Sequence, residues 1–217
     1  MNQPVRKACF AFEFILLFGG IPLLLFLDNR IVHPSVVLIP VLIFIIFVLR
    51  KSDEFRIREL VTLKVSKEGW IRSGIVVILS TIVLLSGVYI FDRENLFNLP
   101  RANPFIWMLL CIFYPVFSAY AQEIIFRTFL YHRYKILFSK TWSFVLASGI
   151  TFSFAHIVYY NPISMILTLF AGLFLSFVYY KTRSVLFTAI LHGLLGIMVF
   201  TVGLGQYFWL DMFEYFP

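Results

Sequence analysis

Charged residues are scarce in this sequence of 217 residues, and that scarcity decides the class of protein. Asp, Glu, Lys and Arg make up 13% of the chain, whereas hydrophobic residues make up 61%, and the mean hydropathy is +0.91. A soluble domain uses about 25% charged residues to cover its surface. The composition therefore excludes a soluble fold and predicts an integral membrane protein.

Cysteine is nearly absent, which excludes further classes of structure. The two cysteines, Cys9 and Cys111, fall near opposite membrane faces in the expected topology, so we expect no disulfide between them. Neither has the spacing of a cysteine metal site. The first apolar run has a basic start but lacks a small-residue cleavage site, so we interpret it as a span and not as a cleaved signal peptide.

Long apolar runs divide the chain into seven expected transmembrane helices, since each crossing needs about 20 apolar residues. The expected spans are 8–27, 35–49, 72–91, 104–132, 142–159, 162–179 and 184–204. The fourth exceeds the thickness of the membrane core and must tilt or kink, for which Pro115 supplies a reason. We expect an all-α, polytopic helical bundle in which residues 1–217 form a single integral membrane domain.

The positive charges alternate from loop to loop and orient this bundle. Of the 18 Lys and Arg residues, 15 fall at the N-terminus and in the second, fourth and sixth loops, and three fall on the other side: Arg30, Arg93 and Arg101. Cytoplasmic loops carry the basic excess, so we expect a cytoplasmic N-terminus and a multi-pass protein of the cytoplasmic (inner) membrane. The net charge of +7 then reflects topology and contact with membrane lipids, and no nucleic-acid partner is expected.

Ionisable side chains within the expected spans are the most informative residues. A charge placed in hydrocarbon costs at least about 2.5–3.5 kcal/mol, so each one needs a reason. Four stand out: Glu123, Arg127, His156 and His192. With a rise of about 1.5 Å per residue, Glu123 falls between the two histidines in depth if its helix continues to residue 132. Glu13 lies near the cytoplasmic end of the first span, where it can meet a nearby arginine.

Spacing along each helix groups these residues by face. Glu123 and Arg127 are four residues apart and can pair, and the guanidinium favours an ionised carboxylate that can act as a base. Phe152 shares a face with His156, where we expect it to pack or to face lipid.

The helix that contains His192 carries Gly196 on the same face, and this glycine leaves the backbone open to close approach.

Three motifs in these spans resemble those of the CPBP family, the intramembrane endopeptidases that include type II CAAX prenyl proteases and bacteriocin-processing or self-immunity proteins. They are QEIIFR (122–127), FSFAH (152–156) and the histidine of LHGLLG at position 192, against a family pattern of E-E-x-x-x-R, F-x-x-x-H and H-x-x-x-N. The resemblance covers a catalytic core at 104–204. It implies hydrolysis of a peptide bond in a membrane-proximal peptide or protein tail, such as a sorting-signal, prenyl-protein-like or bacteriocin-type substrate.

Two departures from the family pattern bear on the activity. Gln122 replaces the first glutamate, which in the family is thought to activate water together with the second-motif histidine. Gly196 replaces the asparagine that is thought to stabilise the oxyanion with the third-motif histidine. Three explanations remain open: Glu123 has become the base, the protein is a non-catalytic peptide-binding or immunity relative, or the glutamine was introduced by engineering.

We favour the first explanation. The catalytic residues are then Glu123, His156 and His192, and the supporting residues are Gln122, Arg127, Phe152 and Gly196. The Glu123 carboxylate should lie within about 3–5 Å of His156, or be linked to it by one water, because proton transfer requires that reach. In the competing geometry Gln122 faces both histidines while Glu123 pairs with Arg127, and the site has lost its base.

Other chemistries fit less well. A glutamate with two histidines is also a zinc ligand set with an open position, but no His-x-x-x-His pair is present, so we expect no metal and no cofactor. A proton-coupled transporter also uses membrane Glu and His, but the chain shows no internal repeat and few broken helices.

Overall fold

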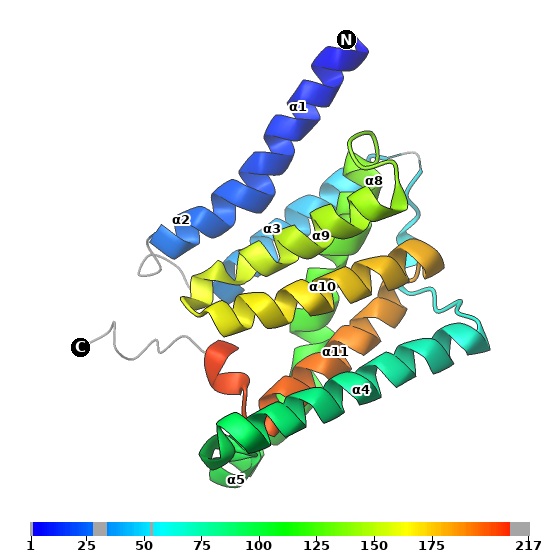
Figure 1. The fold of residues 1–217 in the computed structure, drawn as a ribbon. Coiled ribbons are helices and arrows are strands. Elements are labelled where there is room, and N and C mark those ends of the chain that lie inside the picture. The colour runs from blue at the N-terminus through cyan, green and yellow to red at the C-terminus, as the bar shows by residue number, and fades with distance from the viewer. Residues whose placement is uncertain (1, 28–33, 53, 209–217) are drawn as a thin grey trace.

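The computed structural model describes residues 2–27, 34–52 and 54–208, and this part of the chain is helical without strands (Figure 1). Six helical stretches are long and apolar enough to cross a membrane, and Val36–Arg50 is a shorter apolar helix. The predicted multi-pass helical bundle is confirmed, with about seven spans. The first and third spans begin earlier than expected, at Gln3 and Lys67 instead of 8 and 72.

The helices follow one another as short regular pieces joined by tighter or wider turns. The α-helices are α1 (Gln3–Ile15), α2 (Ile21–Leu27), α3 (Pro34–Arg50), α4 (Lys67–Phe91), α5 (Asn98–Ala102), α6 (Pro104–Phe113), α7 (Tyr120–Glu123), α8 (Leu130–Tyr134), α9 (Thr141–Ala155), α10 (Pro162–Thr182) and α11 (Val185–Val202). The 3₁₀ turns are Ile57–Leu60, Arg93–Asn95, His156–Tyr159 and Gly205–Phe208, and the π-helical turns are Leu16–Gly20, Tyr114–Ala119 and Ile124–Phe129.

Local sequence explains where several spans begin and end. Ser66, Asn161 and Ser184 precede α4, α10 and α11, and each side chain accepts a hydrogen bond from a backbone N–H of the first turn. Gly203 ends α11 with a φ of 114°, a left-handed conformation that glycine adopts without strain. These caps fix the entry and exit of the helices that surround the centre of the bundle.

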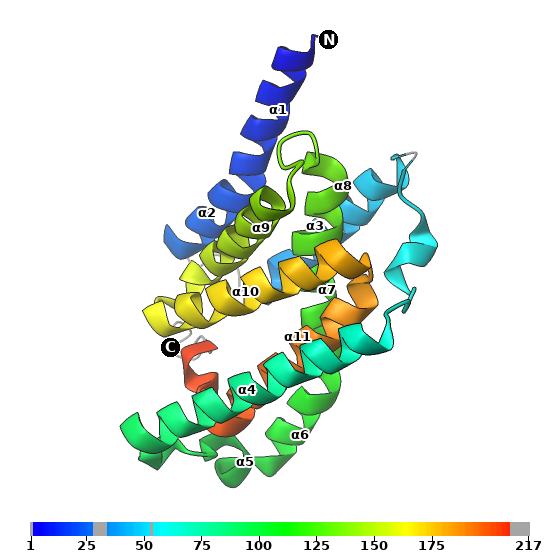
Figure 2. The same cartoon turned by 45° about the vertical axis from the view of Figure 1, so that its right-hand side comes forward.

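The span Pro104–Tyr134 runs through the middle of the bundle and contacts α11 along much of its length, while α9 packs on α10 and α4 packs on the outer side of α11 (Figures 1 and 2). It combines α6, α7 and α8 with two π-helical turns. The irregularity expected at Pro115 takes the form of the first π turn. Since the span continues to Tyr134, Glu123 lies inside the bundle, as the predicted depth requires.

A half-buried ion pair connects the first span to the central one. Glu13 accepts hydrogen bonds from Arg133 at 2.9 and 2.7 Å and from the Tyr134 hydroxyl at 2.9 Å. Its partner is therefore an arginine of α8 and not one of its own helix. This contact holds α1 against α8 although the start of α1 extends away from the other helices (Figure 1).

Replacing Glu13 by alanine is expected to lower the stability of the fold by about 1–2 kcal/mol, because three hydrogen bonds to a charged group are lost at a half-exposed position. Thermal unfolding of the detergent-purified protein measures the change. Glu54→Ala is the matched control, since Glu54 pairs with Lys135 in the open and should leave the melting temperature nearly unchanged. Equal shifts in the two variants would contradict the assignment.

Candidate active site

The central span, the end of α9 and α11 meet at a small cavity of about 80 Å³, which α10 also lines. The lining residues that bear on its chemistry are Tyr114, Ser118 and Gln122 of the central span, Phe152, His156 and Tyr159 at the end of α9, and His192 and Gly196 of α11. Residues up to 82 positions apart in the chain thus form one site, and all three recognised motifs contribute to it.

The way α9 ends fixes the tautomer of the neutral His156 ring. The helix stops at Ala155, and the backbone N–H of His156 bonds to the Ser153 carbonyl in the tighter 3₁₀ pattern. The Phe152 carbonyl is left for the imidazole, whose Nδ1 lies 2.7 Å from it. A carbonyl only accepts, so Nδ1 carries the hydrogen and Nε2 of the neutral ring is a free acceptor. His156 therefore presents a basic nitrogen at the cavity wall.

His192 of α11 is held between a carboxylate and a hydroxyl. Its Nδ1 lies 2.9 Å from Oε1 of Glu123, and its Nε2 lies 3.1 Å from the hydroxyl of Tyr114. The imidazole is 5% exposed and the carboxylate is fully buried. Since an ionised carboxylate only accepts, Nδ1 donates to it, and the orientation of the ring is fixed.

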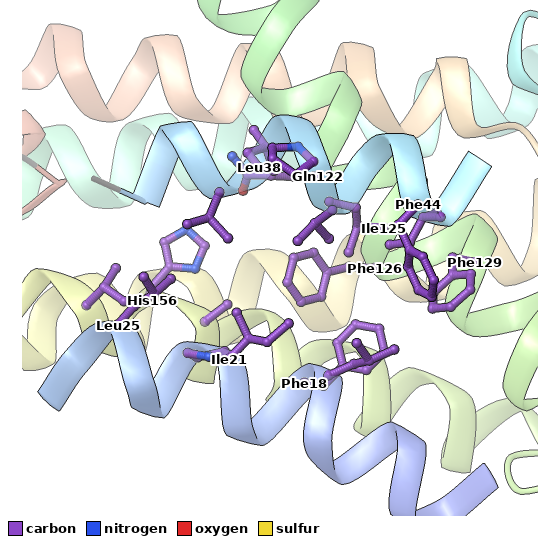
Figure 3. Close-up of a pocket in the computed structure, with 18 of the residues that line it drawn as sticks. Phe18, Ile21, Leu25, Leu38, Phe44, Gln122, Ile125, Phe126, Phe129 and His156 are labelled. Atoms are coloured by element: carbon purple, nitrogen blue, oxygen red, sulfur yellow. The ribbon is translucent and has the colours of Figure 1, made fainter. Parts of the chain in front are cut away.

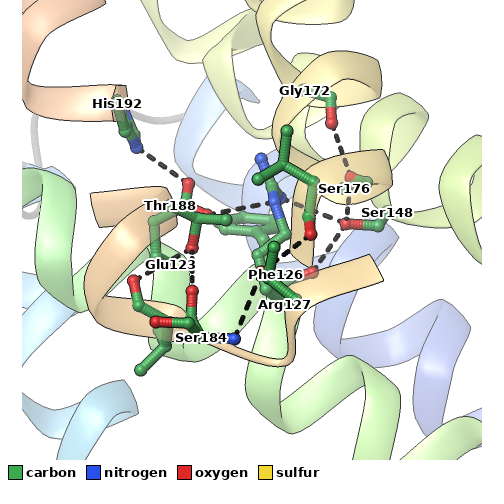
Figure 4. Close-up of polar contacts among 12 residues, drawn as sticks. Glu123, Phe126, Arg127, Ser148, Gly172, Ser176, Ser184, Thr188 and His192 are labelled. Atoms are coloured by element: carbon green, nitrogen blue, oxygen red, sulfur yellow. Dashed lines mark hydrogen bonds and ion pairs between the residues drawn. The ribbon is translucent and has the colours of Figure 1, made fainter. Parts of the chain in front are cut away.

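The carboxylate in turn pairs with Arg127, as its spacing predicts. Nε of Arg127 lies 3.2 Å from Oε2 of Glu123, and both side chains are fully buried. The guanidinium also donates to the Ser148 hydroxyl at 3.1 Å (Figure 4). It stacks over the Phe152 ring at 4.8 Å. A buried charge is tolerated only when paired and hydrogen-bonded, and these contacts supply both conditions.

Glu123 and His156 are not joined by a direct hydrogen bond. Within the described part of the chain, Glu123 bonds to His192 and Arg127 and does not bond to His156. Gln122, its neighbour, lines the cavity instead and donates to Ser118 at 2.8 Å. Consecutive residues diverge by about 100° around a helix, so when Gln122 faces the cavity, Glu123 faces α11. As in the competing geometry, Gln122 faces the cavity and Glu123 pairs with Arg127. Glu123 nevertheless also contacts one of the two histidines, His192.

Phe152 packs at the centre of the site and does not face lipid. It is 1% exposed, and its ring centroid lies 4.8 Å from that of His156 and 5.3 Å from that of His192. The ring therefore separates the two imidazoles and limits the space that a substrate can occupy between them.

Gly196 opens the backbone as predicted, and the ring of Tyr114 fills the space. A Cβ added at position 196 would lie 2.6 Å from both Cζ and the hydroxyl oxygen of Tyr114, closer than real Cβ contacts. Tyr114 and Ser118 were missed as site residues in the sequence. Tyr114, Ser118 and Gln122 follow one another at intervals of four residues, and this spacing is the signal that they share one helix face.

A larger apolar cavity of about 430 Å³ adjoins the small one and shares Ser118, Gln122, His156 and Tyr159 with it. Its other walls come from the π turn Leu16–Gly20, α2, α3, the second half of the central span and the end of α9. Gln122 and His156 lie toward one end of it, and the rings of Phe44 and Phe129 lie toward the other (Figure 3). The polar site thus opens onto a hydrophobic compartment.

No group of three or more His, Cys, Asp and Glu side chains among the described residues is arranged to hold a metal ion. The zinc ligand set that the sequence allowed is divided, since the carboxylate oxygens of Glu123 are engaged by His192 and Arg127.

Comparison with known families agrees with the motifs. Residues 102–198 match the Rce1-like family, type II CAAX prenyl endopeptidase Rce1-like. This stretch nearly coincides with the core expected at 104–204, and the recognised resemblance to the CPBP endopeptidases is confirmed. The match supports an intramembrane endopeptidase and a multi-pass membrane protein. No curated protein and no solved structure matches the chain.

Replacing Arg127 by alanine is expected to destabilise the fold by about 3–5 kcal/mol, because the Glu123 carboxylate would remain buried without its partner. The yield of monodisperse protein and its melting temperature in detergent measure this loss. Arg93→Ala, at an exposed position, should behave like the unmodified protein. A folded Arg127→Ala with an unchanged melting temperature would show that the pair contributes little.

Proposed function

We propose that this chain, with its Rce1-like endopeptidase segment, is an intramembrane protease that hydrolyses a peptide bond in a membrane-proximal peptide or protein tail. The observation that best supports the proposal is the small cavity where His156 presents a free Nε2 opposite His192, which a buried carboxylate holds in place. Peptide hydrolysis requires a base, a water molecule and a donor to the oxyanion. The cavity offers groups for all three functions.

His156 is the proposed general base. Its Nε2 takes a proton from water as the water oxygen bonds to the scissile carbonyl carbon. The same nitrogen returns the proton to the amine when the carbon–nitrogen bond breaks, so the histidine is unchanged at the end. Gln122 orients the water, because its amide nitrogen is engaged by Ser118 and its carbonyl oxygen is left to accept from the water.

His192 lies on the oxyanion side of the cavity. Glu123 accepts from its Nδ1 and fixes the ring with its Nε2 against the Tyr114 hydroxyl, beside the position where negative charge develops. This gives Glu123 a different part from the one that the sequence suggested. It acts through His192 as a positioning residue, and it does not touch the water itself.

The apolar cavity indicates the kind of substrate. A compartment of about 430 Å³ lined mainly by Leu, Ile, Val and Phe, and continuous with the polar site, suits a peptide with an apolar or lipid-modified end. Among the three expected classes, this favours prenyl-protein-like and strongly hydrophobic tails. We place the protein in the cytoplasmic (inner) membrane with its N-terminus in the cytoplasm, and propose no cofactor and no nucleic-acid partner.

Cleavage by the purified protein in liposomes, with internally quenched peptides that end in an apolar tail, tests the proposal. His156→Gln should lower kcat by about 10²–10⁴, the usual contribution of a general base. His132→Gln is the matched control, because this histidine pairs with Glu59 away from the site. Folding of each variant is checked by its melting temperature. Undiminished kcat in a folded His156→Gln would refute the assignment.

Removal of metal tests whether cleavage at the same site depends on a metal ion. Incubation with 1,10-phenanthroline followed by desalting should leave the cleavage rate unchanged, because the proposed mechanism uses imidazole and amide groups alone. If the rate is lost and zinc restores it, His156 and His192 act as ligands and the base mechanism is wrong.

A second candidate function is a non-catalytic protein that binds the same peptides. The specific observation in its favour is that Gln122 and not a carboxylate lines the cavity beside His156. Gln122→Glu separates the candidates, since it restores the family's carboxylate at that position. If the protein is a protease, the unmodified protein should already cleave the peptides. If it is a binding protein, the unmodified protein should not cleave them and Gln122→Glu should gain cleavage. Peptide should then raise the melting temperature of both the unmodified protein and the variant.

A further inference from the structure

We propose that Tyr114 is a further catalytic residue, whose hydroxyl donates to the scissile carbonyl oxygen in the place that the family pattern gives to the asparagine missing at position 196. The inference rests on the proposed peptide hydrolysis. It joins two observations that are separate in the sequence, an aromatic residue in the first π turn of the central span and a glycine in α11.

The position of the tyrosine hydroxyl is set by its neighbours. It lies on the wall of the small cavity, 3.1 Å from Nε2 of His192, at the end of a line of contacts that begins at the buried Glu123. The Tyr114 ring is also packed edge-on against Phe200, with centroids 5.7 Å apart. A ring held on two sides presents its hydroxyl in one place, as a donor to a developing charge must.

Gly196 and Tyr114 depend on each other. A Cβ at position 196 would lie 2.6 Å from the hydroxyl oxygen and 2.6 Å from Cζ, so a side chain there overlaps the ring. The Tyr114 ring and its hydroxyl therefore lie directly against the point where the side chain of residue 196 would begin. An asparagine at 196 and a tyrosine at 114 exclude each other, and the exchange of one polar group for the other keeps a donor beside His192.

The chemistry follows from the hydrogen-bond directions. When His192 carries protons on both nitrogens, Nδ1 donates to Glu123 and Nε2 donates to the oxygen of Tyr114. The hydroxyl hydrogen is then free to point at the carbonyl oxygen. Its hydrogen bond shortens as the tetrahedral oxyanion forms and weakens again when the carbon–nitrogen bond breaks. No proton leaves Tyr114, so no other group has to restore it.

The first test is Tyr114→Phe in the liposome cleavage assay. Loss of one oxyanion donor is expected to lower kcat by about 10²–10³ while KM changes little, because the bond forms mainly in the transition state. Tyr120→Phe is the matched control on the same span. It removes a hydroxyl that donates to the Leu60 carbonyl at 2.9 Å, away from the cavity, and should leave kcat unchanged.

The second test exchanges the two positions. Gly196→Asn alone should lose activity and lower the melting temperature, because the side chain meets the Tyr114 ring. Tyr114→Ala with Gly196→Asn should cleave at least about tenfold faster than Tyr114→Ala alone, since the removed ring makes room for the amide, and oxyanion donors contribute factors of this size or larger. This rescue distinguishes a donor from a residue that only packs.

The outcomes separate this inference from the proposed function. Wild-type protein that cleaves no peptide overturns both. Cleavage by wild type with equal kcat in Tyr114→Phe overturns the inference alone, as does a double variant no faster than Tyr114→Ala in a folded state. Should Gly196→Asn fail to fold, the comparison of Tyr114→Phe with Tyr120→Phe decides by itself.

Discussion

A buried ion pair organises the centre of this protein. Glu123 and Arg127 are both fully buried, and neither would be tolerated in the interior of a membrane bundle without the other. Both members also bond to neighbouring helices. Arg127 donates to Ser148 of α9, and Glu123 accepts from His192 of α11. The same contact therefore joins three helices and fixes the imidazole at the cavity.

Much of this was predictable from the sequence, because it depends on spacing within one helix. The spans, the Glu123–Arg127 pair and the close approach at Gly196 follow from apolar length and from the four-residue repeat. The hydrogen-bond partner of Glu123 was not predictable, since choosing between His156 and His192 requires the rotation of one helix against two others. Two π turns alter that rotation, and although Pro115 indicates an irregularity at the first, no residue pattern predicts its type or the second turn.

The match to known endopeptidases begins only at residue 102, yet the first spans complete the site. Side chains of the π turn Leu16–Gly20, α2 and α3, among them Phe18, Ile21 and Leu38, close one side of the apolar cavity (Figure 3). Apolar walls can be built from many interchangeable residues, so no sequence motif marks this half of the site. The polar half needs particular groups at particular positions, and these are what the motifs record.

The two π turns have a consequence for how such sites diverge. A π turn holds one residue more than an α turn, and here one lies on each side of α7, which contains Gln122 and Glu123 (Figure 2). Loss of a single residue from either turn would rotate everything beyond it by about 100°. A one-residue gap in a relative could then exchange which neighbour meets water and which meets α11. Such a rotation would change which side chain faces the cavity without any substitution in the motif itself.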